Sequence, residues 1–199
     1  GGGTKKQAGR QLRAVVDAAA KEVLPGKTTV FYLGDNLPPG GLGSSDEDHK
    51  QAADLLKTKY RPFTLQGVPV YFMPGEKDWD NSGPEGLLKV NRSGAFIRTL
   101  GDSLVTQAPD NGCPDPQLIR ISDQLAVIVM DSEWWLHLFN KDNQGADCSC
   151  TNERDITNAL GELLYQNRYK TVILATHHPF RDYGRYNPVF TLKDHIFPL

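Results

Sequence analysis

The sequence has no strong excess of charge of one sign, since 22 basic and 24 acidic side chains leave a formal net charge of −2. A basic surface for a nucleic-acid partner is therefore not expected. No apolar run approaches the length that a membrane span needs, and no signal peptide stands at the start. Repeats, linkers and low-complexity tracts are also lacking, so the sequence predicts a single domain over residues 1–199 with a core of ordinary size.

Cysteine is scarce, with three in the chain, and none belongs to the C-x-x-C pair of zinc ribbons or thioredoxins. Cys113, Cys148 and Cys150 all lie in polar stretches rich in proline, aspartate and asparagine. Two interpretations stay open. The three side chains can be unpaired thiols of a reducing compartment. Alternatively, one disulfide can join Cys113 to Cys148 or to Cys150 in an exported protein.

An initiator methionine is also lacking, because the chain begins with three glycines. We expect a processed or trimmed product from which a targeting segment has been removed. No closing strand or helix follows the last apolar residues, so both ends are expected to be cut relative to a complete fold.

What the chain does contain is an alternation of strand-like and helix-like patterns. Continuous apolar runs predict buried strands over 28–33, 68–73 and 171–175. Apolar residues three and four positions apart predict helices over 5–23, 46–60, 86–100 and 153–166, with Ser45 capping the second. Residues 118–121 and 125–130 predict a hairpin, and 107–116 predicts turns. This order predicts an α/β fold, a mixed β-sheet sandwich flanked by helices.

Polar side chains follow three of these apolar runs. Asp35 follows the first, Glu76 the second and His177 the third. The carboxyl ends of strands in an open α/β sheet meet at one edge, so we expect the three side chains to converge there. Adjacent side chains point opposite ways at a strand end, so only one of His177 and His178 is expected to face that site.

The chemistry of these side chains suits a metal. A carboxylate at position 35 can bridge two divalent ions, because each oxygen can bind one of them. A neutral imidazole is a common divalent ligand. The alternative interpretation of Gly34-Asp35-Asn36 is an ordinary turn, for which this tripeptide is typical.

Six segments together resemble a known family. They are FYLGDN (31–36), YFMPGEKDW (71–79), NGCPDP (111–116), VMDSEWWL (129–136), THHP (176–179) and LKDHIFPL (192–199). The chain is similar over nearly its whole length to the calcineurin-like metallophosphoesterases. It most resembles exported bacterial members that are themselves similar to purple acid phosphatases, some of which are joined to outer-membrane domains.

The resemblance implies a site for two metal ions, iron, manganese or zinc. It assigns Asp35 as the bridging carboxylate and His177 as a ligand, and Glu76 remains able to bind metal as a hard oxygen donor. It also implies that Asn36 and His178 lie toward the substrate. The positions of the family's catalytic groups are occupied here by Lys77, Asp78 and Tyr186.

The sequence departs from the family at the positions of the metal ligands and the catalytic groups. Pro38 stands where the family has a tyrosine ligand, and a pyrrolidine ring cannot ligate. Glu76 and Lys77 replace an asparagine ligand and a catalytic histidine, and a charged lysine cannot ligate either. Tyr186 replaces a histidine near the substrate. The family's first and last motifs would fall outside residues 1–199.

These departures predict a metallophosphoesterase-like domain that has lost catalysis, a pseudo-phosphatase that serves as a binding or assembly module. The implied partner is a protein or an adjoining domain, in the periplasm or at the outer membrane. We expect weak binding of at most one divalent metal, or of none. Trp134 and Trp135, one of them exposed, are expected to form a contact surface with the cysteine loops.

Two alternatives remain for the function. The chain can be an active metal-dependent phosphoester hydrolase that uses the atypical ligands Asp35, Glu76 and His177, with Lys77 holding phosphate. It can also be a fragment of a larger enzyme. His49, His137 and His195 lack partners at metal-ligand spacing and are expected not to be ligands.

Overall fold

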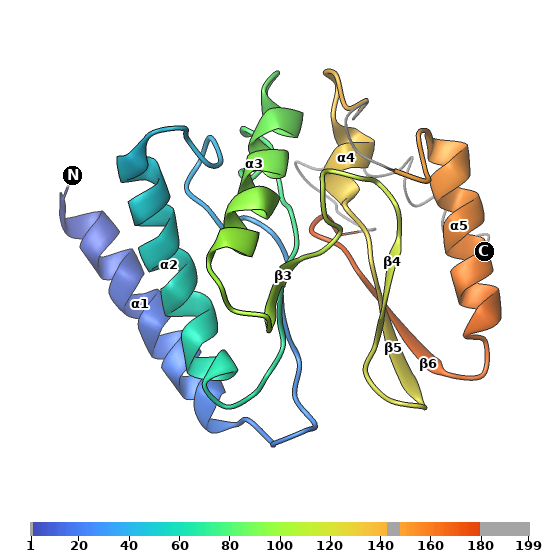
Figure 1. Cartoon of the computed structure of the whole chain (residues 1–199), viewed down its shortest axis with the longest axis horizontal. Coiled ribbons are helices and arrows are strands. Elements are labelled where there is room, and N and C mark those ends of the chain that lie inside the picture. Colours follow the sequence, from blue (N-terminus) through green and yellow to red (C-terminus); the bar gives the residue numbers. More distant parts are fainter. Residues whose placement is uncertain (1, 143–147, 180–199) are drawn as a thin grey trace.

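A computed structural model of the chain describes residues 2–142 and 148–179 (Figure 1). Within these ranges the chain is mixed α/β, with two three-stranded sheets and five helices. The predicted α/β class is therefore confirmed. The first sheet is wholly parallel, and the second sheet is mixed, because β5 pairs antiparallel with one neighbour and parallel with the other.

The first sheet has the order β1 (Val30–Tyr32), β2 (Val70–Phe72), β3 (Val105–Gln107). Parallel neighbours need a crossover, and α2 (Asp46–Thr64) and α3 (Gly86–Thr99) provide the two that this sheet requires. Figure 1 shows these two helices and α1 (Gly2–Lys21) gathered on the side of the first sheet. Their shared core includes fully buried Leu56, Val70 and Phe72.

The second sheet has the order β4 (Gln117–Arg120), β5 (Leu125–Val129), β6 (Thr171–Ala175). The first two strands form the predicted antiparallel hairpin. The crossover from β5 to the parallel strand β6 contains α4 (Ser132–Leu136) and α5 (Glu153–Gln166). Trp79, Ile128 and Leu160 are buried together in the core on this side.

Several local predictions are confirmed. The strand over 171–175 and the helix over 153–166 have the predicted bounds. Ser45 caps α2 in a reciprocal capping box, because its hydroxyl accepts from the Asp48 backbone N–H while the Asp48 carboxylate accepts from the Ser45 backbone N–H. Three acidic residues in the first turn also favour the positive end of the helix dipole.

Two short elements, and the exposure of two tryptophans, differ from the prediction. Strand β3 and helix α4 lie where no regular element was predicted. Both Trp134 and Trp135 are buried, with 3% and 5% exposure, so the prediction that one of them is an exposed contact residue is wrong. Each indole packs into the core beside α5. The exposed apolar side chains of this stretch are instead Leu138 and Phe139.

The sequence left open whether the cysteines are unpaired or form one disulfide, and the structure contains the disulfide. Cys113 and Cys148 form a disulfide, and Cys150 is a buried free thiol. Among the helices of the described ranges, none combines the length and the apolar character that crossing a membrane would require.

Candidate functional site

The ends of β1, β2 and β6 meet although β1 and β6 belong to different sheets. The Nε2 atom of His177 lies 3.5 Å from Oδ1 of Asp35. Lys77, which follows β2, contacts the same carboxylate through its ammonium group. We call Asp35, Lys77 and His177 the front site. The structure thus brings together the ends of three strands that are far apart in the sequence.

Two glycines, in the turns that follow β1 and β2, let the His177 ring lie close to the backbone of these turns. Gly34 has a φ of +99°, and a side-chain carbon there would overlap the His177 ring. A side-chain carbon at Gly75 would come within 2.9 Å of the same ring and 2.6 Å of the Asp35 backbone nitrogen. Nδ1 of His177 is 2.6 Å from the carbonyl oxygen of Leu33. A carbonyl can only accept, so Nδ1 carries the proton and Nε2 faces Asp35.

Lys77 neutralises Asp35. Its backbone N–H donates to Oδ1 at 3.0 Å, and its ammonium group donates to Oδ2. Partial burial acts to raise the pKa of Asp35, but the hydrogen bonds from Lys77 outweigh burial and hold that pKa below its ordinary value. The hydrogen bond to Asp35 also raises the pKa of Lys77. The pair is therefore ionised at neutral pH.

Asp78 and Asn36 have internal partners. The buried Asp78 carboxylate accepts from the backbone N–H groups of Asn36, Leu37 and Gly75 at 3.0–3.1 Å. Burial raises its pKa, against the effect of these three donors. The Asn36 side chain is also buried and donates to the carbonyl of Met73. Both side chains hold the two turns together, and Oδ1 of Asn36 is buried without a hydrogen-bond partner among the described residues.

Lys59 of α2 is a buried residue that the sequence analysis did not single out. Its ammonium group donates to the carbonyl of Asn36 at 2.9 Å and lies 5.3 Å from the centre of the Tyr32 ring. Burial lowers its pKa to about 8, while Asp78 and Asp35 act in the opposite direction. A signal for this burial exists in the sequence, because Lys59 lies on the helix face that also carries Ala52, Leu56 and Phe63.

His178 points away from His177, as strand alternation predicts. The two rings stand edge to face at 4.8 Å. Nδ1 of His178 is 2.9 Å from the hydroxyl of Ser132, which also accepts from the His178 backbone N–H. Nε2 lies 3.6 Å from the carboxylate of Glu133. Burial lowers the pKa of His178, so its neutral form is favoured.

More buried polar groups lie along α4 and at its two ends. Asp131 accepts from the indole N–H of Trp79 at 2.8 Å and caps α4. Burial raises its pKa to about 7. Glu133 accepts from the Ser82 hydroxyl at 2.6 Å and lies 3.7 Å from Nδ1 of His137. We call Asp131, Ser132, Glu133, His137 and His178 the buried network.

Glu76 is a further predicted site residue, and it is not part of the front site. Glu76 is half-buried, and its backbone carbonyl accepts from the N–H of Ser82. Its carboxylate does not complete a ligand set with Asp35 and His177. Tyr186 lies outside the described residues.

The front site does not fit the two metal ions that the resemblance implies. An ammonium group already contacts the carboxylate oxygen that would have to bind one ion. Among the described residues, one group of three or more histidine, cysteine or acidic side chains has all its ligand atoms within 4.8 Å, and it consists of Cys113, Asp115 and Cys148. Asp35, Glu76 and His177 therefore do not form a metal-binding set as they stand.

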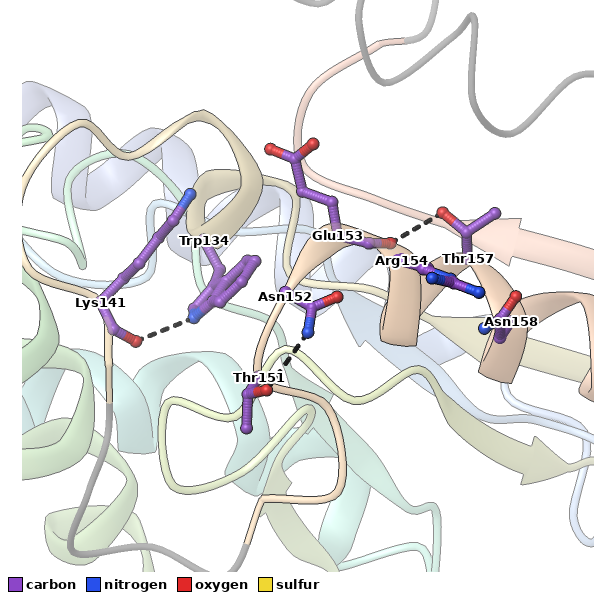
Figure 2. A pocket seen from close by; sticks show the side chains of 8 residues that line it. All are labelled: Trp134, Lys141, Thr151, Asn152, Glu153, Arg154, Thr157 and Asn158. Atoms are coloured by element: carbon purple, nitrogen blue, oxygen red, sulfur yellow. Dashed lines mark hydrogen bonds between the residues drawn. The ribbon is translucent and has the colours of Figure 1, made fainter.

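A separate cavity of about 640 Å³ lies at the start of α5 (Figure 2). Figure 2 shows Lys141 beside the indole of Trp134, whose N–H donates to the Lys141 carbonyl. The Lys141 ammonium lies 4.4 Å from the ring centre, and burial lowers its pKa. Glu153 and Arg154 bring charges of both signs to the same cavity. Its lining includes no residue of the front site.

Comparisons of the chain with protein families, curated proteins and solved structures find no match.

Proposed function

We propose that the chain is a metallophosphoesterase-like domain of the exported bacterial kind that has lost catalysis and serves as a binding or assembly module. The partner would be a protein or an adjoining domain. The disulfide between Cys113 and Cys148 is compatible with the oxidising compartment that export implies.

The contact between Lys77 and Asp35 is the observation that carries this proposal. A hydrolase of this kind needs an open metal position at which water becomes a nucleophile. Here a resident cation takes the place of the ion at the carboxylate. At neutral pH a lysine with a raised pKa is also a poor proton donor to a leaving group. Asp78, the other acid at the catalytic positions, is buried against backbone donors.

The direct test measures metal content and turnover of the chain with its disulfide intact. After chelation and dialysis, manganese, iron or zinc is added, and bound metal is counted by elemental analysis. We expect at most one weakly held equivalent, and no metal-dependent hydrolysis of an aryl phosphate. Two tightly bound equivalents, with turnover that disappears in Asp35→Asn, would overturn the proposal.

An active phosphoester hydrolase with atypical ligands is the second candidate. The observation in its favour is the orientation of His177, whose Nδ1 is engaged by Leu33 while Nε2 faces Asp35. This orientation leaves Nε2 free to bind a metal if Lys77 turns away. The turnover assay separates the two candidates, because only the hydrolase loses a measurable activity on substitution of His177.

A further inference from the structure

A groove of about 470 Å³ lies between the two sheets, beside the strands β1 and β6 that end them. Its walls come from β1 and the residues on either side of it, from the second sheet and from the last residues of β6. The lining is apolar apart from two threonines and one lysine. We call the space bordered by Lys27, Phe31, Leu33, Val127, Ile173 and Leu174 the sheet groove. It shares no residue with the front site.

The edge of β1 beside this groove pairs with no strand of the described residues, since β1 ends the first sheet and β2 lies on its other side. The N–H of Val30 and the carbonyl of Tyr32 are bonded on the side of β2. Backbone groups alternate in direction along a strand, so the N–H and carbonyl of Phe31 point away from β2. The next outward carbonyl, that of Leu33, lies 2.6 Å from Nδ1 of His177, which follows β6. The free edge of β1 is therefore turned toward β6.

The edge of β6 is free in the same way. In the part of the chain that the structure describes, β6 ends the second sheet, with β5 on its other side. The N–H of Thr171 and the carbonyl of Ala175 are bonded on the side of β5. The backbone groups of Val172 and Leu174 therefore point away from β5. Both sheets thus present backbone donors and acceptors at one groove.

Neither edge has the features with which proteins usually protect a free strand. Charged residues and proline at an edge discourage pairing with another chain. The sequences of β1, VFY, and of β6, TVILA, contain none of them. The groove also leaves apolar side chains in water, because Leu33 is 50% exposed and Ile173 is 49% exposed.

We propose that the sheet groove binds an extended peptide segment of a protein partner, which adds as a strand between β1 and β6. An extended peptide offers N–H and carbonyl groups on both of its sides, while its side chains meet the apolar walls. A lipid or a flat aromatic molecule would cover these walls and leave both edges unpaired. The β1 side of the groove includes positions 29 to 33, so a segment of about five residues, at about 3.3 Å per residue, matches it.

The charge of the groove defines the peptide further. Lys27 is the one charged residue in the described lining, and it precedes β1. At the other end of β1 the Leu33 carbonyl is already engaged by His177. A peptide that is apolar along the groove and carries an acidic side chain at the Lys27 end complements this surface.

This binding mode deepens the proposed function and rests on it only for the existence of a protein partner. Peptide binding and metal-dependent turnover are measured separately. An active hydrolase that binds the peptide would refute the loss of catalysis alone, and an inactive chain that does not bind it would refute the role of the groove alone.

The test titrates a peptide into the isotope-labelled full chain with its disulfide intact and follows the amide resonances. The probe has about seven residues, in which valine and threonine alternate, with one glutamate at either end, because a strand can add parallel or antiparallel. We expect saturable shifts at Phe31, Val172 and Leu174 for at least one placement of the glutamate. No saturable shift at up to about 1 mM peptide, or shifts elsewhere only, would overturn the proposal.

Altered probes separate the backbone contacts from the charge. N-methylation of alternate residues removes the donors to one edge and should weaken binding at least about tenfold. A lysine in place of the glutamate should weaken it about twofold to threefold, and Lys27→Glu should restore it. Equal binding of the N-methylated probe would exclude strand addition, and a lysine probe indifferent to Lys27→Glu would refute the acidic preference.

Variants of the chain locate the site. Ile173→Glu places a charge in the groove at a half-exposed position and should weaken binding at least about tenfold. Leu65→Glu is the matched control, because Leu65 is 75% exposed at the end of α2, and it should leave binding unchanged. Circular dichroism checks the fold, and Leu33→Glu replaces Ile173→Glu if that variant does not fold. Equal binding by the groove variant and the control would contradict the proposal.

Other occupants of the groove would give different results. A second copy of the chain would appear as a dimer in sedimentation that Ile173→Glu abolishes, in place of peptide binding. A small apolar ligand would appear as binding of anilinonaphthalene sulfonate in the groove without binding of the peptide. Peptide binding only after removal of residues 180–199, which lie outside the described residues, would assign the groove to this chain's own end. Each of these results would overturn the proposal.

Discussion

His177 lies beside the partly exposed side chains of Asp35 and Lys77, whereas His178, the next residue, is buried between Ser132 and Glu133. In the front site Asp35 and Lys77 are partly exposed and in contact with each other, and the pKa shifts of both favour their ionised forms. In the buried network desolvation shifts the pKa values of Asp131 and His178 in the directions that favour their neutral forms. Two neighbouring residues at one strand end therefore lie in opposite environments, one facing solvent and one facing the core.

The largest expected effect concerns Asp131 of the buried network. Its pKa is about 7 in the folded chain against a usual value of 3.8. Between these values the folded state holds a proton that the unfolded state has released. This contribution to stability is complete below about pH 4 and is lost as the pH rises through about 7. Asp131→Asn cannot titrate, so the stability of the natural chain relative to this variant should fall by on the order of 4 kcal/mol across that range.

Urea unfolding at several pH values measures this difference. Asp123→Asn, which makes the same substitution at an exposed position of the hairpin turn, is measured in parallel as the matched surface control. Parallel pH curves for the natural chain and Asp131→Asn would contradict the assignment.

The next prediction compares the loss of stability when one charged side chain is truncated to alanine in the buried network and one in the front site. Glu133→Ala leaves the Ser82 hydroxyl without its acceptor and opens a cavity in the buried network, so we expect a loss of about 3 kcal/mol. Lys77→Ala removes an ion pair whose lysine side chain is 42% exposed. That change should cost less than about 1 kcal/mol. Urea midpoints at neutral pH test both, and similar losses would erase the contrast between the regions.

A smaller effect tests the close approach of His177 to its turn. Gly34→Ala combines a left-handed backbone with a side-chain carbon that overlaps the His177 ring, and we expect a loss of about 2 kcal/mol or more. Gly67 has a φ of +75° but nothing within 4 Å of a side-chain carbon. Gly67→Ala therefore isolates the backbone contribution and should cost about 1 kcal/mol. Equal losses in thermal or urea unfolding would show that the ring moves aside freely.

The smallest effect is expected on metal binding at the front site. Lys77→Ala frees the Asp35 carboxylate, so the affinity for manganese or zinc should rise about tenfold, equivalent to about 1.4 kcal/mol. Lys89→Ala also removes a lysine that pairs with an acid, Glu85, but away from the front site. Isothermal titration of the oxidised chain compares the two variants. An unchanged affinity in Lys77→Ala would mean that the ammonium group does not exclude metal.

Much of the fold could be predicted because its longer elements carry their own pattern. Helix α5 and strand β6 have an amphipathic period and a continuous apolar run that identify them without tertiary contacts. Strand β3 has three residues, and its pairing with β2 depends on a distant segment. Helix α4 has five residues and depends on the Asp131 cap and on the burial of two tryptophans. Such short elements are defined by long-range packing.

The location of the candidate site could be predicted from the sequence. The partners of its side chains could not. The convergence of strand ends follows from open α/β architecture, and it placed Asp35 near His177. The ion pair of Lys77 with Asp35 depends on side-chain direction in a turn, which sequence spacing does not define. The internal role of Asp78 depends on three backbone donors from two separate loops. Side-chain partners across loops therefore required the structure.

The three hydrogen bonds of Asp78 have a consequence for exchange with solvent deuterium. Asn36, Leu37 and Gly75 lie in loops after β1 and β2, where amide protons ordinarily exchange fast. Their N–H groups all donate to one buried carboxylate, so none can be released to water unless the loops separate. These amides should exchange together and about as slowly as those of the adjoining strands. We therefore expect the two loops to open as slowly as the strands beside them, even though the pairings of β1, β2 and β3 do not include them.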